Sequence, residues 1–574
     1  MTDRADHLAP RTDWRLFVPK LVTALREGYG PSLLRHDAIA GLTVAIVALP
    51  LSMALAIASG ATPAQGLVTA VVAGFLISAL GGSRFQIGGP TGAFVVVVYN
   101  VIDTYGYDGL LLATLMAGII LIAAGFARFG TWIKYIPDSV VTGFTAGIAV
   151  IIFSSQIKDL FGLSMDEVPA EFVDKWHAFW LARDTVDIPS LVIAGGALAL
   201  IIVLRRFAPK VPGFLIAVVL ASLVVAVSGV SVDTIGSRFG GIAASIPAPR
   251  LPEISIDRIV ELLPSAFTIA FLAGVESLLS AMVADGMTGR RHRSNCELVA
   301  QGAANAASAL VGGLPATGAI ARTATNIRSG ARTPVSGMLH AVFLLAFMLV
   351  AAPLASYIPL ASLAAVLVIV AWNMSEVERF RQLLSAPWGD RLVLLTTFGL
   401  TVMVDLTVAI EVGVVMAAIL FMHRMSEVVA IGQPGVTIVE TDEDETAAEA
   451  RRARRIALED LPPDIQVLQM RGPLFFGVAN RLADVMDRIG TPPRVYIVRM
   501  RDVPLIDSSG SARFREFLNH ARRHKTKVIV CGLQRGPKRT LIGMHILHPG
   551  DGVHLAQDFA AALKLARTLI DDPA

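Results

Sequence analysis

A nearly continuous apolar stretch from Ala38 to about Arg424 is the feature that most restricts how this chain can fold. Only glycine, proline and scattered charges interrupt it. Because a membrane-spanning helix needs about 20 apolar residues, the stretch predicts a membrane domain with many spans. The composition agrees, since 54% of the residues are hydrophobic and only 17% are charged. These values exclude a soluble enzyme, a disordered scaffold and a secreted disulfide module.

Charge and cysteine content exclude further classes. The net charge of +3 is too small to indicate a nucleic-acid partner. Cys296 and Cys531 are the only cysteines, so a disulfide framework is not expected. The histidines have no metal-ligand spacing, and the glycine-containing stretch 532–538 lacks the Walker lysine spacing. We therefore expect neither a metal nor a nucleotide cofactor, and the sequence does not indicate ATP-driven transport.

Polarity divides the chain into four predicted segments. Residues 1–37 form a polar N-terminal segment without a cleavable signal, 38–424 a helical membrane domain, 425–463 a hydrated linker, and 464–574 a small α/β domain. In the last segment, strand and helix patterns alternate. The expected strands are 464–470, 495–500 and 528–531, and the expected helices are 479–489, 511–523 and 558–569.

About 14 membrane spans are expected in the membrane domain. Lys and Arg concentrate in every second loop, for example at Arg290, Arg291 and Arg293, which places both termini in the cytoplasm. The clear spans are 38–58, 66–80, 110–127, 140–160, 191–204, 214–230, 264–284, 334–352, 354–372, 392–404 and 408–422, and the shorter ones are 91–102, 296–311 and 317–326.

An internal repeat points to a binding site inside the membrane. Gly88-Gly89-Pro90-Thr91-Gly92-Ala93-Phe94 resembles Gly312-Gly313-Leu314-Pro315-Ala316-Thr317-Gly318-Ala319-Ile320, with Thr91 and Thr317 separated by 317 − 91 = 226 residues. Repeated Gly/Pro-interrupted segments of this kind indicate the central site of a transporter with inverted repeats. Two half-helices starting near Thr91 and Thr317 would direct their free N–H groups at an anion. The alternative is that both segments are packing kinks.

Two ionisable residues lie within the predicted spans. Glu276 is surrounded by Gly274, Val275 and Leu278, and a carboxyl group at that depth is a functional candidate that can hold and release a proton. Arg322 lies one turn into the second half-helix and could hold the anion or pair with Glu276. The alternatives are a structural carboxylate and an arginine that extends to the cytoplasmic face.

A short loop opens a helix in the C-terminal domain. Asp507-Ser508-Ser509-Gly510 could hold a phosphate or be phosphorylated at Ser508. Ordinary N-capping by Asp507 or Ser508 is the favoured alternative.

These motifs resemble the SulP family of sulfate permeases and anion exchangers. The resemblance rests on Gly88-Gly89-Pro90-Thr91, Gly274-Val275-Glu276-Ser277 and Ala316-Thr317-Gly318-Ala319, while Pro504-Leu505-Ile506-Asp507 resembles the STAS domain of such proteins. It implies 14 segments in a 7+7 inverted repeat of the uracil-transporter type, core and gate subdomains, and homodimers with an elevator motion. Within the family, three segments most resemble bacterial C4-dicarboxylate transporters: Asp285-Gly286-Met287-Thr288-Gly289, Glu297-Leu298-Val299 and Ala371-Trp372-Asn373-Met374-Ser375-Glu376.

The resemblance also implies site residues. Glu276 would carry the coupled proton. Carried over residue by residue, the anion would lie against Leu51, Leu55, Thr91, Gly92, Ala93, Thr317, Gly318, Ala319, Ile320 and Arg322.

The function predicted from these observations is secondary active uptake of a small anion, such as a C4-dicarboxylate, together with a proton across a bacterial inner membrane. A sulfate or bicarbonate transporter or exchanger is the nearest alternative. Sodium coupling is less well supported, because Ile320 offers no side-chain oxygen and only Ser280 lies one turn from Glu276. An anion sensor that signals through the STAS domain and an anion channel are the remaining alternatives.

Overall fold

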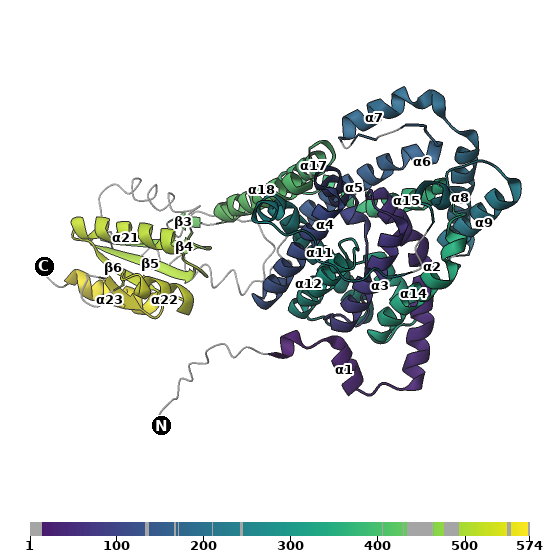
Figure 1. Cartoon of the computed structure of the whole chain (residues 1–574). Coiled ribbons are helices and arrows are strands. Elements are labelled where there is room, and N and C mark those ends of the chain that lie inside the picture. Colours follow the sequence, from purple (N-terminus) through teal and green to yellow (C-terminus); the bar gives the residue numbers. More distant parts are fainter. Residues whose placement is uncertain are drawn as a thin grey trace. The chain divides into compact units, whose positions relative to one another are not determined.

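The computed structural model of the chain divides into two compact units, Met1–Ala417 and Ala418–Ala574, which we describe separately (Figure 1). The described residues are 14–131, 137–165, 168–169, 171–208, 211–241, 245–404, 406–428, 430–432, 462, 464–475, 493–547 and 553–571.

One group of helices in the first unit holds both halves of the sequence repeat. Its members pack mainly against one another, and the most extensive contact joins α4 to α12. Several of these helices are buried over more than half of their most apolar part. The group consists of α2 (Pro31–Ala58), α3 (Pro63–Leu80), α4 (Val95–Phe126), α11 (Ile256–Thr288), α12 (Ser294–Leu310), α13 (Ile320–Arg328) and α14 (Val335–Ala355).

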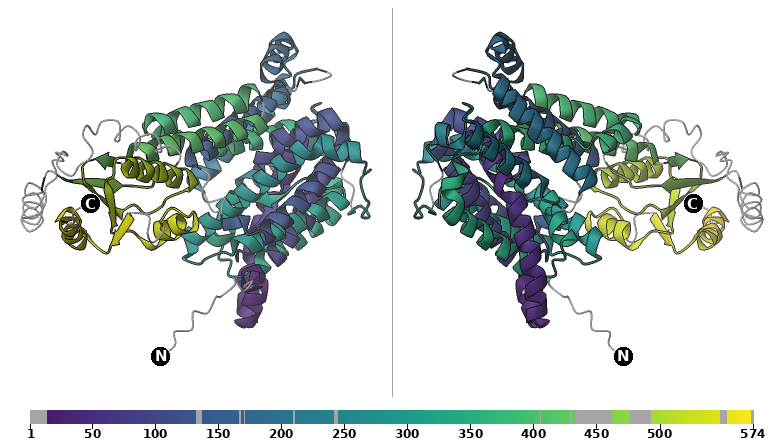
Figure 2. Two further views of the ribbon diagram at one scale, coloured as in Figure 1. Left: turned by 90° about the vertical axis from the view of Figure 1, so that its left-hand side faces the viewer. Right: turned by 90° about the vertical axis from the view of Figure 1, so that its right-hand side faces the viewer.

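A second group packs around α5 and α15, and Figure 2 shows the two groups from two sides. It meets the first group where α15 and α9 contact α2 and where α5 contacts α4. Its members are α5 (Asp138–Ser155), α6 (Ile157–Phe161), α8 (Ile188–Phe207), α9 (Gly213–Ser228), α15 (Leu360–Met374) and α17 (Trp388–Met403). The remaining helices are α1 (Lys20–Arg26), α7 (Phe172–Leu181), α10 (Ile235–Phe239), α16 (Val377–Leu384) and α18 (Leu406–Val428), with 3-10 turns η1 (Trp14–Phe17), η2 (Gly92–Phe94), η3 (Phe129–Thr131) and η5 (Arg183–Thr185).

Nine helices in the described part of the chain are long and apolar enough to cross a membrane, and α9 is a shorter apolar helix. Sequence alone predicted two spans where the structure has α4. The two are joined at Gly106, whose φ of 72° and ψ of 176° break the helix into two parts. Such a backbone conformation suits glycine, because a side chain is strained there.

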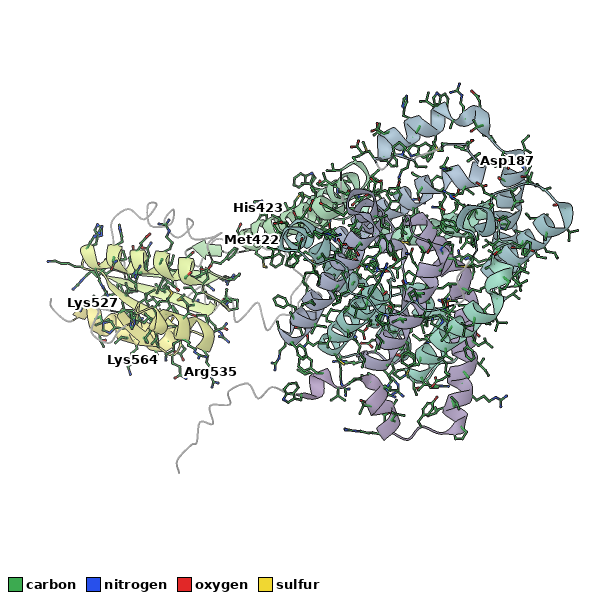
Figure 3. The ribbon with its side chains drawn as sticks, viewed as in Figure 1. Asp187, Met422, His423, Lys527, Arg535 and Lys564 are labelled. Atoms are coloured by element: carbon green, nitrogen blue, oxygen red, sulfur yellow. The ribbon has the colours of Figure 1, made fainter. Side chains whose placement is uncertain are left out.

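Local sequence explains where several helices begin. Thr62 and Gln65 form a capping box at the start of α3, with Pro63 in the first turn. The side chain of Asp187, labelled in Figure 3, accepts a hydrogen bond of 3.0 Å from the N–H of Ser190 at the start of α8. These caps satisfy donors that the first turn leaves free.

One predicted span begins at the wrong residue. The span expected at 354–372 starts at Leu360, and Leu354 instead belongs to the last turn of α14. The intervening backbone pairs with another segment, since the N–H of Leu360 donates to the carbonyl of Asp233 and that of Ile235 to the carbonyl of Ile358. These bonds replace helical ones, and apolar periodicity alone does not report them.

The second unit contains a five-stranded sheet of order β3-β4-β5-β6-β7, with β3 antiparallel to β4 and the other neighbours parallel. Apolar clusters cover both faces, one around Phe514 and Phe517 and the other around Ala562 and Ala566. The elements are β3 (Ala430–Gly432), β4 (Ile465–Arg471), β5 (Val495–Asp502), β6 (Lys527–Cys531), β7 (Val553–Ala556), α21 (Ser508–Arg523), α22 (Arg535–Gly543) and α23 (Phe559–Asp571).

The three predicted strands and two of the predicted helices of this unit are present, whereas β3, β7 and α22 were missed. β3 and β7 are only three and four residues long, too short to show alternation. Figure 3 labels Lys527 at the start of β6 and Arg535 at the start of α22. The helix expected at 479–489 and most of the linker expected at 425–463 lie outside the described residues.

Candidate functional site

The two matched segments of the repeat lie side by side. β1 (Gly88–Gly89) pairs antiparallel with β2 (Thr317–Gly318), with Gly88 opposite Gly318 and Gly89 opposite Thr317. One further step in this register sets Pro90 opposite Ala316, and these two residues are 316 − 90 = 226 apart, the same offset as the repeat. The predicted meeting of the two segments is therefore observed.

A helix begins just after each strand. η2 starts at Gly92 and leads into α4, while α13 starts at Ile320, three residues later than the sequence predicted. Neither Thr91 nor Ala319, the residues before these helices, makes a side-chain capping bond. The first-turn N–H groups of both helices are thus uncapped by side chains at these positions, which is the arrangement that suits an anion.

Glu276 reaches the start of the first of these helices. It lies in α11, is half-buried, and accepts a 2.8 Å hydrogen bond at Oε2 from the hydroxyl of Thr91. Its neighbours Gly274, Val275 and Ser277 are buried. The structure therefore joins Glu276 and Thr91, which are 185 residues apart in the sequence.

Arg322 occupies the other side of the strand pair. Its side chain is buried, and Nη2 donates a 3.1 Å hydrogen bond to the carbonyl of Pro90. Nε and Nη1 are also buried, and no described residue accepts a hydrogen bond from either of them. No ion pair joins Arg322 to Glu276 in the part of the chain that the structure describes. The alternative in which Arg322 extends to the cytoplasmic face is wrong, because the residue is only 3% exposed.

The second segment is held within its own helix group. The hydroxyl of Thr317 donates a 2.9 Å hydrogen bond to the carbonyl of Ala273 in α11. Gly318 packs against the side chain of Gln86, whose Nε2 donates a 2.6 Å hydrogen bond to the hydroxyl of Ser277. Thr317 therefore uses its side chain for a tertiary contact, although the sequence placed it against the anion.

The remaining predicted site residues lie at the two helix starts, in the first turn of α13 and on α2. Ala93 and Ala319 are buried beside the helix starts, and Ile320 is half-buried in the first turn of α13. Leu51 is half-buried and Leu55 is buried on α2, after Pro50, on a helix that packs against α13.

Sequence reasoning assigned no role to Glu297. This fully buried carboxylate on α12 accepts four hydrogen bonds. The donors are the N–H groups of Gly82 at 2.8 Å and Ser83 at 3.1 Å, Gln301 Nε2 at 2.9 Å and the Ser277 hydroxyl at 3.2 Å. Glu297 thereby ties the loop after α3 to α11, next to Glu276. An acidic residue in a helix rich in small residues was the available signal.

The structure also shows the start of α21 in the second unit. Asp507 Oδ1 accepts a 2.7 Å hydrogen bond from the N–H of Gly510, so N-capping by Asp507 is confirmed. Ser508 is exposed at the first position of the helix.

Removing this cap should loosen α21. An N-cap of this kind contributes about 1 kcal/mol, which corresponds to about a fivefold change in an equilibrium constant. We therefore expect Asp507→Ala to lower the hydrogen-exchange protection of α21 amides about fivefold in the full-length protein. Glu516→Ala, which removes only an exposed contact with Arg513, should change protection little. Equal protection in both variants would contradict the prediction.

Comparison with known proteins identifies the family. Residues 34–397 match the model of the sulfate permease family, and residues 460–561 match the model of the STAS domain. The chain belongs to the sulfate permease family. It is therefore an anion transporter with many membrane-embedded helices and a STAS domain, and not an enzyme.

Two curated relatives cover most of the chain. The protein "Putative sulfate transporter YvdB" of Bacillus subtilis (strain 168) is 41% identical over 91% of this chain and 96% of its own length. "Bicarbonate transporter BicA" of Synechocystis sp. is 30% identical over 92% of this chain and 94% of its own length. The family prediction is confirmed, whereas these names refer to sulfate and bicarbonate and not to dicarboxylates.

Two solved structures resemble this one. The transmembrane domain of a cyanobacterial BicA is 31% identical, covers 68% of this chain and 98% of its own, and has a TM-score of 0.59. "The overall structure of SLC26A9" covers 96% of this chain and 93% of its own with a TM-score of 0.83, at 16% identity. At that identity the second match shows a shared fold alone.

Proposed function

We propose that this transporter moves a small anion by secondary active transport and couples its movement to a proton carried by Glu276. The observation that carries the proposal is the hydrogen bond between Glu276 and Thr91 at the uncapped start of η2. A substrate anion attracted by the N–H groups of that helix start would lie beside the carboxyl group.

The charges in the site support this coupling. An ionised Glu276 repels an incoming anion, whereas a protonated Glu276 removes the repulsion and can donate a hydrogen bond. Arg322 supplies a permanent positive charge on the other side of the strand pair. Binding of the anion would therefore favour binding of the proton, as symport requires.

The proposed substrate is a small anion. The sequence motifs and the names of the relatives favour different anions. The motif at 371–376 resembles C4-dicarboxylate transporters, whereas the names of the relatives favour sulfate or bicarbonate. Helix N–H groups bind all of these anions. Competition of sulfate, bicarbonate and succinate for uptake into proteoliposomes, with and without an inward proton gradient, tests the substrate and the coupling together.

Sodium coupling is a weaker alternative at this position. A sodium site needs several oxygen ligands, and the hydroxyl of Ser280 already donates a 3.1 Å hydrogen bond to the hydroxyl of Thr323. Uptake that depends on a sodium gradient and is indifferent to a proton gradient would support this alternative against ours.

We further propose the arrangement that such transport needs. In it, 14 spans form a 7+7 inverted repeat, with the first helix group as the moving core and the second as the gate of an elevator in a homodimer. Both termini lie in the cytoplasm of a bacterium, and the chain is in the inner membrane. The register of β1 and β2 supports the repeat, since its next step would set Pro90 opposite Ala316, two residues that the repeat makes equivalent. Phosphorylation at the exposed Ser508 would regulate the rate.

Thr91 should matter for substrate affinity. Thr91→Val removes the hydrogen bond to Glu276 without a large change in volume. Because the bond holds the protonated carboxyl group of Glu276 beside the anion and a hydrogen bond between neutral groups contributes about 1 kcal/mol, we expect the half-saturation concentration for anion uptake to rise about fivefold. Thr114→Val is the matched control, because the Thr114 hydroxyl donates to the carbonyl of Leu110 in its own helix. An unchanged half-saturation concentration in Thr91→Val would contradict the proposed site.

The same assay separates a transporter from a sensor or a channel. A sensor would bind anion without accumulating it inside proteoliposomes. A channel would conduct anions but would not concentrate them when a proton gradient is imposed. Uphill uptake excludes both alternatives.

A further inference from the structure

We infer that Met374, the last residue of α15, forms the wall of the anion site opposite η2 and limits the size of the anion that the transporter accepts. The inference rests on the proposed function, because it assumes that the anion binds at the start of η2.

The contact between Met374 and η2 is direct. A Cβ built on Gly92 would lie 2.5 Å from Met374 Sδ and 3.4 Å from its Cε, and 3.2 Å from Ile152 Cδ1. The thioether therefore packs on the backbone of the first residue of η2. Ile152 is fully buried on α5, whereas Met374 is half-buried. Of the two, Met374 has the freedom to move.

Met374 and Ile152 belong to the second helix group. Glu276 belongs to the first, and Thr91 precedes η2, which leads into α4 of the first group. The start of η2 thus faces across the boundary between the groups. The surroundings of Gly318 in β2 are different. Its nearest neighbours are three atoms of the Gln86 side chain, and no atom of the second helix group is among them. The second helix group therefore closes one side of the site, and Met374 is the residue of that group that packs there.

The sequence around Met374 holds it in place. Asn373 Oδ1 accepts a 2.8 Å hydrogen bond from Arg205 Nη1 of α8, which anchors the end of α15. Glu376 has a φ of 38°, so the chain turns sharply two residues after Met374. Arg379 then bonds Asp138 at the start of α5, with 3.1 Å between Nε and Oδ2. This assigns a physical role to the motif at 371–376, which had entered the sequence analysis only as a resemblance.

The chemistry of methionine suits a wall of this kind. Its side chain carries no charge and is flexible, so it fills irregular space and can be pushed aside at modest cost. A compact anion at the N–H groups of η2 would leave Met374 in place. A longer anion would have to displace the thioether, and its affinity would fall by the cost of that displacement.

The first test compares anions of different size. Binding of sulfate and of succinate to purified full-length protein is measured by isothermal titration calorimetry. Because changes of this size in an apolar wall alter discrimination about tenfold or more, we expect Met374→Ala to shift the affinity ratio toward succinate by at least about fivefold and Met374→Phe to shift it toward sulfate. Met403→Ala, on the exposed surface of α17, should leave the ratio unchanged. A ratio that Met374→Ala and Met374→Phe both leave unchanged would overturn the inference.

The second test uses the contact itself. Gly92→Ala places a methyl group only 2.5 Å from Met374 Sδ, so we expect anion affinity to fall about tenfold and to recover when Met374→Ala is added. Gly318→Ala is the matched control, because its methyl group would meet Gln86, and Met374→Ala should not restore it. If adding Met374→Ala restores anion affinity in both glycine variants, or in neither, the contact between Gly92 and Met374 is not the cause of the lost affinity.

These outcomes are separate from those for the proposed function. If Thr91→Val weakens binding while the Met374 variants leave the affinity ratio unchanged, the proposed anion site is supported and the size limit assigned to Met374 is wrong. If Thr91→Val and Gly92→Ala both leave binding of sulfate and succinate intact, the anion site lies elsewhere and both proposals fail.

Discussion

Glu276→Gln should bind anion as the wild type does but lose accumulation driven by a proton gradient. An imposed gradient of one pH unit supplies about 1.4 kcal/mol for each coupled proton, which supports about tenfold accumulation. Glutamine keeps the size and one hydrogen-bond acceptor of the side chain but cannot release a proton. The expected accumulation ratio in proteoliposomes therefore falls from about ten to about one.

The control for this prediction lies on the same helix. Glu261 is exposed on α11, and Glu261→Gln should accumulate anion as the wild type does. Glu276→Asp keeps a titratable group and should keep partial coupling. If Glu276→Gln still concentrates anion under the imposed gradient, Glu276 does not carry the proton, and the coupling ion or residue must be sought elsewhere.

Gly318→Val should abolish most uptake. A side chain at Gly318 would collide with Gln86, whose amide donates to the hydroxyl of Ser277 beside Glu276. Ser277 in turn donates to the buried carboxylate of Glu297 at 3.2 Å. Overpacking of a well-packed interior costs about 1–3 kcal/mol, so we expect uptake to fall at least about tenfold. A side chain at this position has to displace Gln86, so the cause is loss of packing as well as obstruction of the anion.

Three further variants keep this prediction testable. Gly195 lies exposed on α8 with open space around it, so Gly195→Val should leave uptake unchanged. Should Gly318→Val be too unstable to purify, Gly318→Ala should lose less uptake. Adding Gln86→Ala should then restore part of the loss, because it removes the colliding atoms. Wild-type uptake by well-folded Gly318→Val would show that this strand is not part of the site.

The paired segments show how much of the site the sequence predicts. The offset of 226 residues identifies both segments from the sequence alone, and the strand register agrees with it, because one step beyond the pair of Gly89 and Thr317 it sets Pro90 opposite Ala316. The roles of individual side chains are harder to predict. Thr317 and Thr91 are equivalent in the repeat, yet Thr317 bonds a backbone carbonyl and Thr91 bonds Glu276. A repeat determines equivalent positions, but the partner of each side chain depends on which helix packs there.

The sequence by itself determined the membrane class, the family, the depth of Glu276 in an apolar helix and the pair of glycine-rich segments. These properties follow from local composition and from motifs within a few residues of one another. Only the tertiary structure brought Thr91 to Glu276, set Arg322 behind Pro90, gave Glu297 its four-partner network and placed Met374 over Gly92. These contacts join residues far apart in the chain, and the packing of whole helices selects them, so no local pattern in the sequence records them.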